Sequence, residues 1–188
     1  MKSVIEKIGS IPNWYGVAIV LIYALLMAEY LSEINNLCID YDLKANNIMK
    51  IFMGISYVLT IISSVVIWGV LCLMFHLTAL LLDGKQVFSK FLFLSSYFYI
   101  IPAVAMVVAI VLLGGVEVEE SAIQVEKLVS NSKFNVITNI VNFSFFIFYS
   151  FSAFCIRYLY GLGWIRSFLS VVIPIASIWG MTSFFNIL

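Results

Sequence analysis

The stretch IFMGISYVLTIISSVVIWGVLCLMFHLTALLL, residues 51–82, contains no Asp, Glu, Lys or Arg, and its one histidine is the only side chain in it that could be cationic. About 20 apolar residues are enough to cross a bilayer as an α-helix. In a water-soluble domain, this run and the similar runs on either side of it would need a core larger than the chain provides. The stretch therefore indicates a membrane protein.

Four more apolar runs flank this one, and together they predict an all-α fold, a polytopic transmembrane bundle that forms a single transmembrane domain over residues 1–188. The expected spans are about 14–31, 51–75, 91–113, 136–156 and 168–187. We expect helices because the bilayer interior has no water to satisfy open backbone groups, and the alternating pattern of a membrane strand is absent. A helix over all of 51–82 would be about 48 Å long, against roughly 30 Å of hydrocarbon, so its end is predicted to emerge near Asp83.

The basic residues predict the orientation of the chain, because cytoplasmic loops carry an excess of Lys and Arg. Six of the ten basic residues fall on the side of the amino terminus: Lys2, Lys7, Lys85, Lys90, Arg157 and Arg166. The other four fall on the opposite side: Lys44, Lys50, Lys127 and Lys133. The sequence therefore predicts a cytoplasmic amino terminus and an external carboxyl terminus.

The composition argues against several classes of protein. With 63% hydrophobic residues and ten basic against ten acidic side chains, the chain offers no basic surface for nucleic acid. Its three cysteines, Cys38, Cys72 and Cys155, have no CxxC spacing, so neither a disulfide framework nor a metal site is expected. No cofactor is predicted. Because there is a single histidine, no HExxH motif and no lysine within a span, we predict that the protein is not an enzyme.

The fourth predicted span carries the most pronounced polar stripe. Its members recur on one helical face: Asn135, Asn139, Asn142 and Tyr149. A milder stripe on the second span consists of Ser56, Thr60 and Ser63. Carboxamides in hydrocarbon need hydrogen-bond partners, so the first stripe is predicted to face either other helices or a hydrated cavity. Both interpretations stay open: interhelical hydrogen bonds that hold the bundle, or a path for a ligand or an ion.

Three single residues within the spans also carry predictions. His76 is either a titratable group on a proton pathway or an imidazole near the interface, and the absence of acids in the middle of the spans favours the second interpretation. Pro102 and Pro174 each remove one backbone hydrogen bond from the third and fifth spans. They predict kinks at these two positions.

The order of parts resembles the Yip family, five-span membrane proteins that are named for interaction with Ypt/Rab GTPases and have many bacterial members. The resemblance rests on the end of the second span at Leu80–Lys85, on Phe88-Ser89 and Ser96-Tyr97 before Pro102, and on Tyr158–Gly163. It covers about half of the chain. Serine stands in place of the family's glycine before Tyr97, and the Asp-Leu-Tyr-Gly-Pro motif of the eukaryotic members is missing. The resemblance therefore implies a short prokaryotic-type member in a cytoplasmic membrane.

This resemblance implies a non-enzymatic integral membrane protein that acts through partner proteins, self-association or lipid organisation. Its cytoplasmic contacts would come from two loops, with the residues Asp83, Gly84, Lys85, Lys90, Arg157 and Arg166. Basic side chains at such positions attract anionic headgroups of the bilayer. The alternative is a small transporter or substrate-binding membrane subunit. Its polar cavity would be lined by Thr60, Ser63, Asn139, Asn142 and Tyr149.

Overall fold

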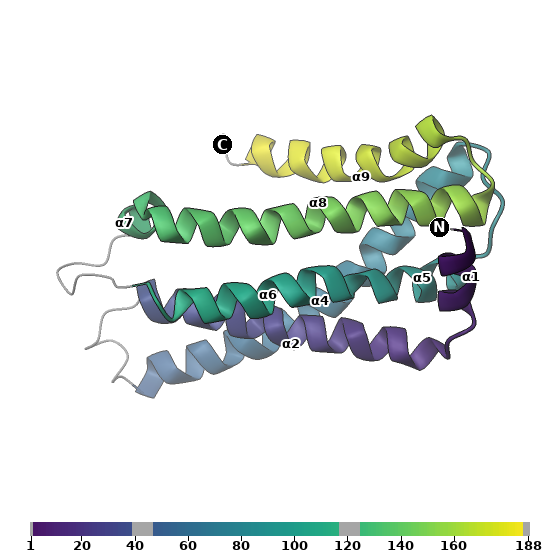
Figure 1. The fold of residues 1–188 in the computed structure, drawn as a ribbon. Coiled ribbons are helices and arrows are strands. Elements are labelled where there is room, and N and C mark those ends of the chain that lie inside the picture. The colour runs from purple at the N-terminus through teal and green to yellow at the C-terminus, as the bar shows by residue number, and fades with distance from the viewer. Residues whose placement is uncertain (1, 39–46, 117–124, 186–188) are drawn as a thin grey trace. The chain divides into compact units, whose positions relative to one another are not determined.

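The computed structural model describes residues 2–38, 47–116 and 125–185, and within these ranges the regular secondary structure is helical (Figure 1). Five helical segments are long and apolar enough to cross a membrane: α2 (Asn13–Cys38), α4 (Asn47–Leu81), α5 to α6 (Phe88–Leu113), α8 (Ser132–Tyr160) and Trp164–Ser183 of α9. The predicted all-α class and the five spans are confirmed. The predicted orientation of the chain ends stays a prediction.

Each of these helices begins before its predicted span, and all but one of them reach or pass its predicted end. The helix α4, for example, has 35 residues and runs through the polar Asn47 at its start to Leu81. Hydropathy locates the part of a helix that lies in hydrocarbon, whereas backbone hydrogen bonds continue into the polar interface. The exception is α9 (Trp164–Phe185), because residues 186 and 187 of the predicted fifth span lie outside the described residues.

The third span is interrupted close to its predicted kink. The helix α5 (Phe88–Ser96) is followed by a 3₁₀ turn, η1 (Tyr97–Tyr99), and then by α6 (Ile100–Leu113). Pro102 therefore lies in the first turn of α6, where a missing backbone N–H costs little. Pro174 lies inside α9. Two short helices complete the described elements, α1 (Lys2–Gly9) before the first span and α7 (Val125–Ser130) before the fourth.

Contacts between Cα atoms divide the chain into two compact units. The first unit comprises Met1–Val20, Val66–Tyr99 and Ile147–Leu188, and the second comprises Leu21–Val65 and Ile100–Phe146. The helices α2, α4 and α8 each contribute residues to both units. The prediction of one transmembrane domain over the whole chain stays a prediction.

The first unit has a tightly packed core between α2, α5 and the second halves of α4 and α8. Phe91 and Ile156 are fully buried in it. At Gly16 of α2, an added Cβ would collide with the Oγ of Ser96 and would lie 3.2 Å from the carbonyl oxygen of Phe93. Small residues at this crossing therefore let the two backbones approach closely, as is usual between transmembrane helices.

The second unit has a core made mainly of small and flexible side chains. Ala24 of α2 and both Met106 and Ala109 of α6 are fully buried. Tyr23 of α2 meets Phe145 of α8 edge to face, with ring centroids 6.3 Å apart. The outer surfaces of both units remain rich in exposed Leu, Ile, Val and Phe. Such surfaces are expected where helices face lipid.

Candidate functional site

Three chain segments that are far apart in the sequence meet at one end of the first unit. They are residues 2–9, 82–90 and 157–166, and we call their common surface the interfacial face. The backbone N–H of Lys85 donates to the carbonyl oxygen of Tyr160 at 3.4 Å, and Gln86 Nε2 donates to that of Leu159 at 3.2 Å. Tyr158 Oη donates to Glu6 Oε1 at 2.7 Å. These hydrogen bonds hold the three segments together.

The turn after α4 is fixed by its backbone conformation. Asp83 has a φ of 73°, a left-handed conformation that glycine usually occupies at the end of a helix. The next N–H, of Gly84, donates to the carbonyl oxygen of Ala79 at 2.9 Å. A Cβ on Gly84 would lie 2.7 Å from this same oxygen and 3.0 Å from the ring of Tyr160. Only glycine fits here without displacement of its neighbours.

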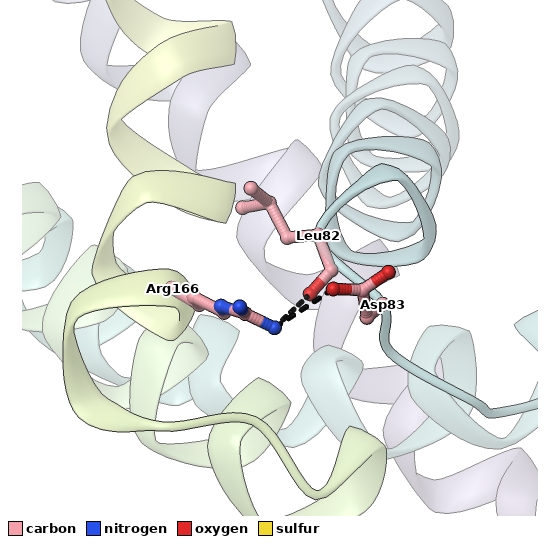
Figure 2. Close-up of polar contacts among 3 residues, drawn as sticks. All are labelled: Leu82, Asp83 and Arg166. Atoms are coloured by element: carbon pink, nitrogen blue, oxygen red, sulfur yellow. Dashed lines mark hydrogen bonds and ion pairs between the residues drawn. The ribbon is translucent and has the colours of Figure 1, made fainter.

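One ion pair joins this turn to the start of α9 (Figure 2). Arg166 Nη1 lies 2.8 Å from Asp83 Oδ2 and also donates to the carbonyl oxygen of Leu82 at 3.4 Å. The two side chains are 55% and 81% exposed, so water and salt screen the pair and its contribution to stability is at most about 1 kcal/mol. The contact orients the loop more than it stabilises the fold.

Arg157 makes a different contact on the same face. Its guanidinium carbon lies 3.8 Å from the ring centroid of Trp164, in a cation–π arrangement across the loop between α8 and α9. The loop turns at Gly161, whose φ of 67° favours glycine. Arg157 and Trp164 are both exposed. An aromatic ring with a basic group at the end of a span is typical of a membrane–water interface.

The helix α1 lines one side of a pocket on the interfacial face. The pocket has a volume of about 340 Å³ and lies between α1, α5 and the end of α8. Ile5 is buried, whereas Glu6 and Lys7 are exposed, so α1 turns its apolar side to the protein and its charged side outward. The polar part of the lining consists of Glu6, Asn13, Ser89, Lys90, Tyr97 and Tyr158.

His76 lies just beneath the interfacial face. Its Nδ1 shares a hydrogen bond with Tyr160 Oη, and its ring lies 5.3 Å from that of Phe88. Both His76 and Tyr160 are buried. The imidazole thus has a phenol as its hydrogen-bond partner, which supports the interpretation of a packed histidine near the interface over that of a proton pathway.

The predicted polar stripes do not meet within the described residues. Asn139 and Asn142 are exposed on α8, and no hydrogen bond joins either side chain to Thr60 or Ser63. Thr60 donates to the carbonyl oxygen of Ser56 in its own helix at 2.9 Å. Ser63 is exposed, and Tyr149 packs edge to face on Phe75, with centroids 6.3 Å apart.

The predicted cytoplasmic contact residues, in contrast, share one surface. Asp83, Gly84, Lys85, Lys90, Arg157 and Arg166 all lie in the segments that form the interfacial face, and all of them except the buried Gly84 are exposed. The sequence did not indicate that Glu6, Tyr158 and Tyr160 are hydrogen-bond partners at this face, although Tyr158–Gly163 is one of the segments that carry the resemblance. Sequence reasoning also missed Trp164, although a tryptophan directly before a predicted span is a usual marker of the interface.

No three His, Cys, Asp or Glu side chains of the described residues gather in an arrangement that could hold a metal ion. Comparisons with protein-family models, with curated proteins and with solved structures find no match for this chain. The functional assignment therefore depends on the chemistry of the interfacial face and on the five apolar helices.

Proposed function

We propose that this chain is a non-enzymatic integral membrane protein of Yip-like type, which organises anionic lipid at its interfacial face. The observation that carries the proposal is the assembly of three distant segments on one surface by hydrogen bonds between side chains and backbone. A surface that is fixed in this way is preorganised for binding. The proposed assignment to a Yip-like type depends on the motif residues at 80–85, 96–97 and 158–163 and on the five spans.

The charge of the interfacial face supports this proposal. Its segments 2–9, 82–90 and 157–166 contain six basic residues and two acidic ones, a difference of four positive charges. The two acids already have partners, since Glu6 accepts from Tyr158 and Asp83 pairs with Arg166. Four further cations of this face, Lys7, Lys85, Lys90 and Arg157, are exposed. Each exposed basic residue at a membrane surface contributes about 1 kcal/mol of attraction to anionic headgroups.

The shape of the face supports it as well. Ile8, Ile11 and Phe93 give the pocket under α1 an apolar wall, while Lys90 and Ser89 lie at the same pocket. A phospholipid has both of these chemistries in one molecule, with acyl chains beside a phosphate. The pocket volume of about 340 Å³ is in the range of small-molecule sites and suits part of one lipid.

The transporter alternative receives less support. It needs an enclosed polar cavity at the asparagine stripe, because a hydrated path must be lined by the groups that contact the solute. Asn139 and Asn142 are exposed instead. In the second unit, the small pocket near Thr60 has a volume of about 10 Å³, which is no more than the space for one water molecule.

Native mass spectrometry of the purified protein tests the proposal. The protein is reconstituted with equal amounts of phosphatidylcholine and phosphatidylglycerol, and the lipids that remain bound after mild delipidation are counted. Wild-type protein is expected to retain phosphatidylglycerol preferentially. In the variant Lys85→Gln/Lys90→Gln/Arg157→Gln, the ratio of retained phosphatidylglycerol to phosphatidylcholine is expected to fall at least about fivefold, because three surface cations are removed.

The matched control is Lys50→Gln/Lys133→Gln, which removes two cations from outside the interfacial face. It should retain the wild-type preference. Equal retention of the two lipids by the wild-type protein, or an equal loss of preference in the triple variant and in the control, would contradict the proposal.

A further inference from the structure

The helix α8 presents an unusual polar seam to the outside of the second unit. The seam consists of Asn135, Asn139, Asn142 and Phe146, which follow each other at intervals of four, three and four residues. All four are exposed. The side chains of Asn139 and Asn142 have no hydrogen-bond partner among the described residues.

Two of these carboxamides lie at the depth of hydrocarbon. The helix α8 runs from Ser132 to Tyr160, so its middle is near Phe146. At 1.5 Å per residue, Asn142 lies about 6 Å and Asn139 about 10 Å from the middle, within the roughly 15 Å half-thickness of the hydrocarbon layer. There a carboxamide finds no water, and on this exposed face the described residues offer it no hydrogen-bonding group. An unpaired carboxamide at this depth therefore costs free energy relative to one in water.

A second copy of the same seam could supply the hydrogen bonds that these asparagines lack in the described part of the chain. A carboxamide both donates and accepts, so two asparagines that face each other can form a reciprocal pair of hydrogen bonds. The alternation of intervals of four and three residues is that of the seam between two helices in a coiled coil, in which a polar asparagine fixes register and partner number. Lipid tails offer neither donors nor acceptors.

We propose that the protein forms a homodimer in the membrane through the α8 seam, with Asn139 and Asn142 hydrogen-bonded to the same residues of a second copy. Copies of one membrane protein insert in the same direction, so the two α8 helices run parallel about a two-fold axis along the membrane normal. In such an interface each residue near the axis meets its own counterpart. Phe146 and Phe143, whose rings stack at a centroid distance of 6.2 Å, extend the contact toward the middle of the bilayer.

Disulfide cross-linking in membranes tests this geometry. Single cysteines are introduced as Asn139→Cys and Asn142→Cys in a Cys38→Ala background, since Cys72 and Cys155 are buried. Each variant is expected to form a disulfide-linked dimer on mild oxidation. The matched control is Val108→Cys on α6, which is also exposed in the second unit and should remain monomeric. The background without an introduced cysteine reports any dimer formed through Cys72 or Cys155.

The strength of association gives an independent measurement. Single-molecule photobleaching in liposomes, with protein density varied, yields the dimer dissociation constant. The double variant Asn139→Leu/Asn142→Leu is expected to raise this constant at least about tenfold, because it removes both hydrogen-bonded pairs. Asn139→Gln, which keeps a carboxamide, should stay within about threefold of the wild-type constant. Thermal melting of each variant in detergent at low concentration checks that the monomer still folds.

Four results would overturn the proposal. The first is cross-linking of Val108→Cys as efficient as that of Asn139→Cys. The second is a wild-type protein that stays monomeric at every density in liposomes, and the third is a double leucine variant that dimerises as well as the wild type. The fourth is cross-linking of Asn139→Cys in native membranes to a different protein and never to a second copy.

Discussion

The two units of this chain differ in the polar side chains of their helices: both bury hydrogen-bonded serines, such as Ser144 in the second unit, but the second unit also exposes asparagines on α8. In the first unit, several buried polar groups are paired, since Cys72 Sγ lies 3.1 Å from Ser95 Oγ, and His76 is bonded to Tyr160. Ser152 is also buried and donates to the carbonyl oxygen of Phe148 in its own helix at 3.0 Å. In the second unit, Asn139 and Asn142 point outward from α8.

The difference follows from what each side chain can satisfy locally. A serine hydroxyl donates to the carbonyl three or four residues earlier in its own helix, so a serine can be buried without any partner from another helix. It is also small, which allows close helix packing. A carboxamide has two donors and two acceptor lone pairs, more than its own helix can take up. Burial therefore suits serine, whereas asparagine needs a second surface.

Substitution of Gly16 should have the largest effect on the free energy of unfolding, because it removes the close packing that small residues permit in the first unit. Gly16→Leu places a side chain against Ser96 and the backbone of Phe93, and is expected to lower the free energy of unfolding by about 3 kcal/mol. Reversible unfolding in mixed micelles measures it. The control is Gly69→Leu on α4, where an added Cβ meets no atom within 4 Å, and it should cost less than about 1 kcal/mol. Equal effects at the two glycines would mean that the crossing is not tight.

Removal of the Tyr160 hydroxyl should have an intermediate effect. Tyr160→Phe leaves His76 Nδ1 without its partner in a buried position, and the expected loss is about 2 kcal/mol. Tyr15→Phe is the matched control, because the Tyr15 ring is exposed and stacks on Trp14 through its face rather than through its hydroxyl. A loss as small as that of the control would show that the buried polar pair contributes nothing to stability.

Substitution of Asn139 should have the smallest effect on the folded monomer. Asn139→Leu changes an exposed residue that has no hydrogen-bond partner in the part of the chain that the structure describes, so the free energy of unfolding measured at low protein concentration should change by no more than about 0.5 kcal/mol. A loss of about 1 to 2 kcal/mol is expected if the carboxamide bridges two helices of the same chain. The same unfolding assay in mixed micelles distinguishes these two outcomes.

The sequence alone was sufficient to predict the five spans. In a bilayer every backbone group must find its partner within a helix, so a long apolar run without charges leaves little choice of structure. The buried side of α2 could also be predicted from the sequence, because small residues recur at every fourth position. These residues are Gly16, Val20, Ala24 and Ala28, and all four are buried. Small residues at this spacing are typical of helix contacts in membranes.

Only part of the candidate site could be predicted from the sequence. The basic loops were recognised, but the bond between His76 and Tyr160 joins residues that are 84 positions apart, and no local pattern indicates it. The face that α8 presents outward was not predicted either. In water, apolar residues mark the buried side of a helix, whereas in lipid both sides are apolar and that contrast is lost. The asparagines were therefore expected to point inward.

The fixed end of α4 has a consequence for the membrane in which this protein can reside. With 35 residues the helix is about 52 Å long, and the left-handed turn at Asp83 together with the bond from Gly84 to Ala79 keeps its last turn from fraying. A helix that cannot shorten adapts to hydrophobic mismatch by leaning or by thickening the lipid around it. The thinner the membrane, the further α4 must tilt, so bilayer thickness is a variable to which this fold responds.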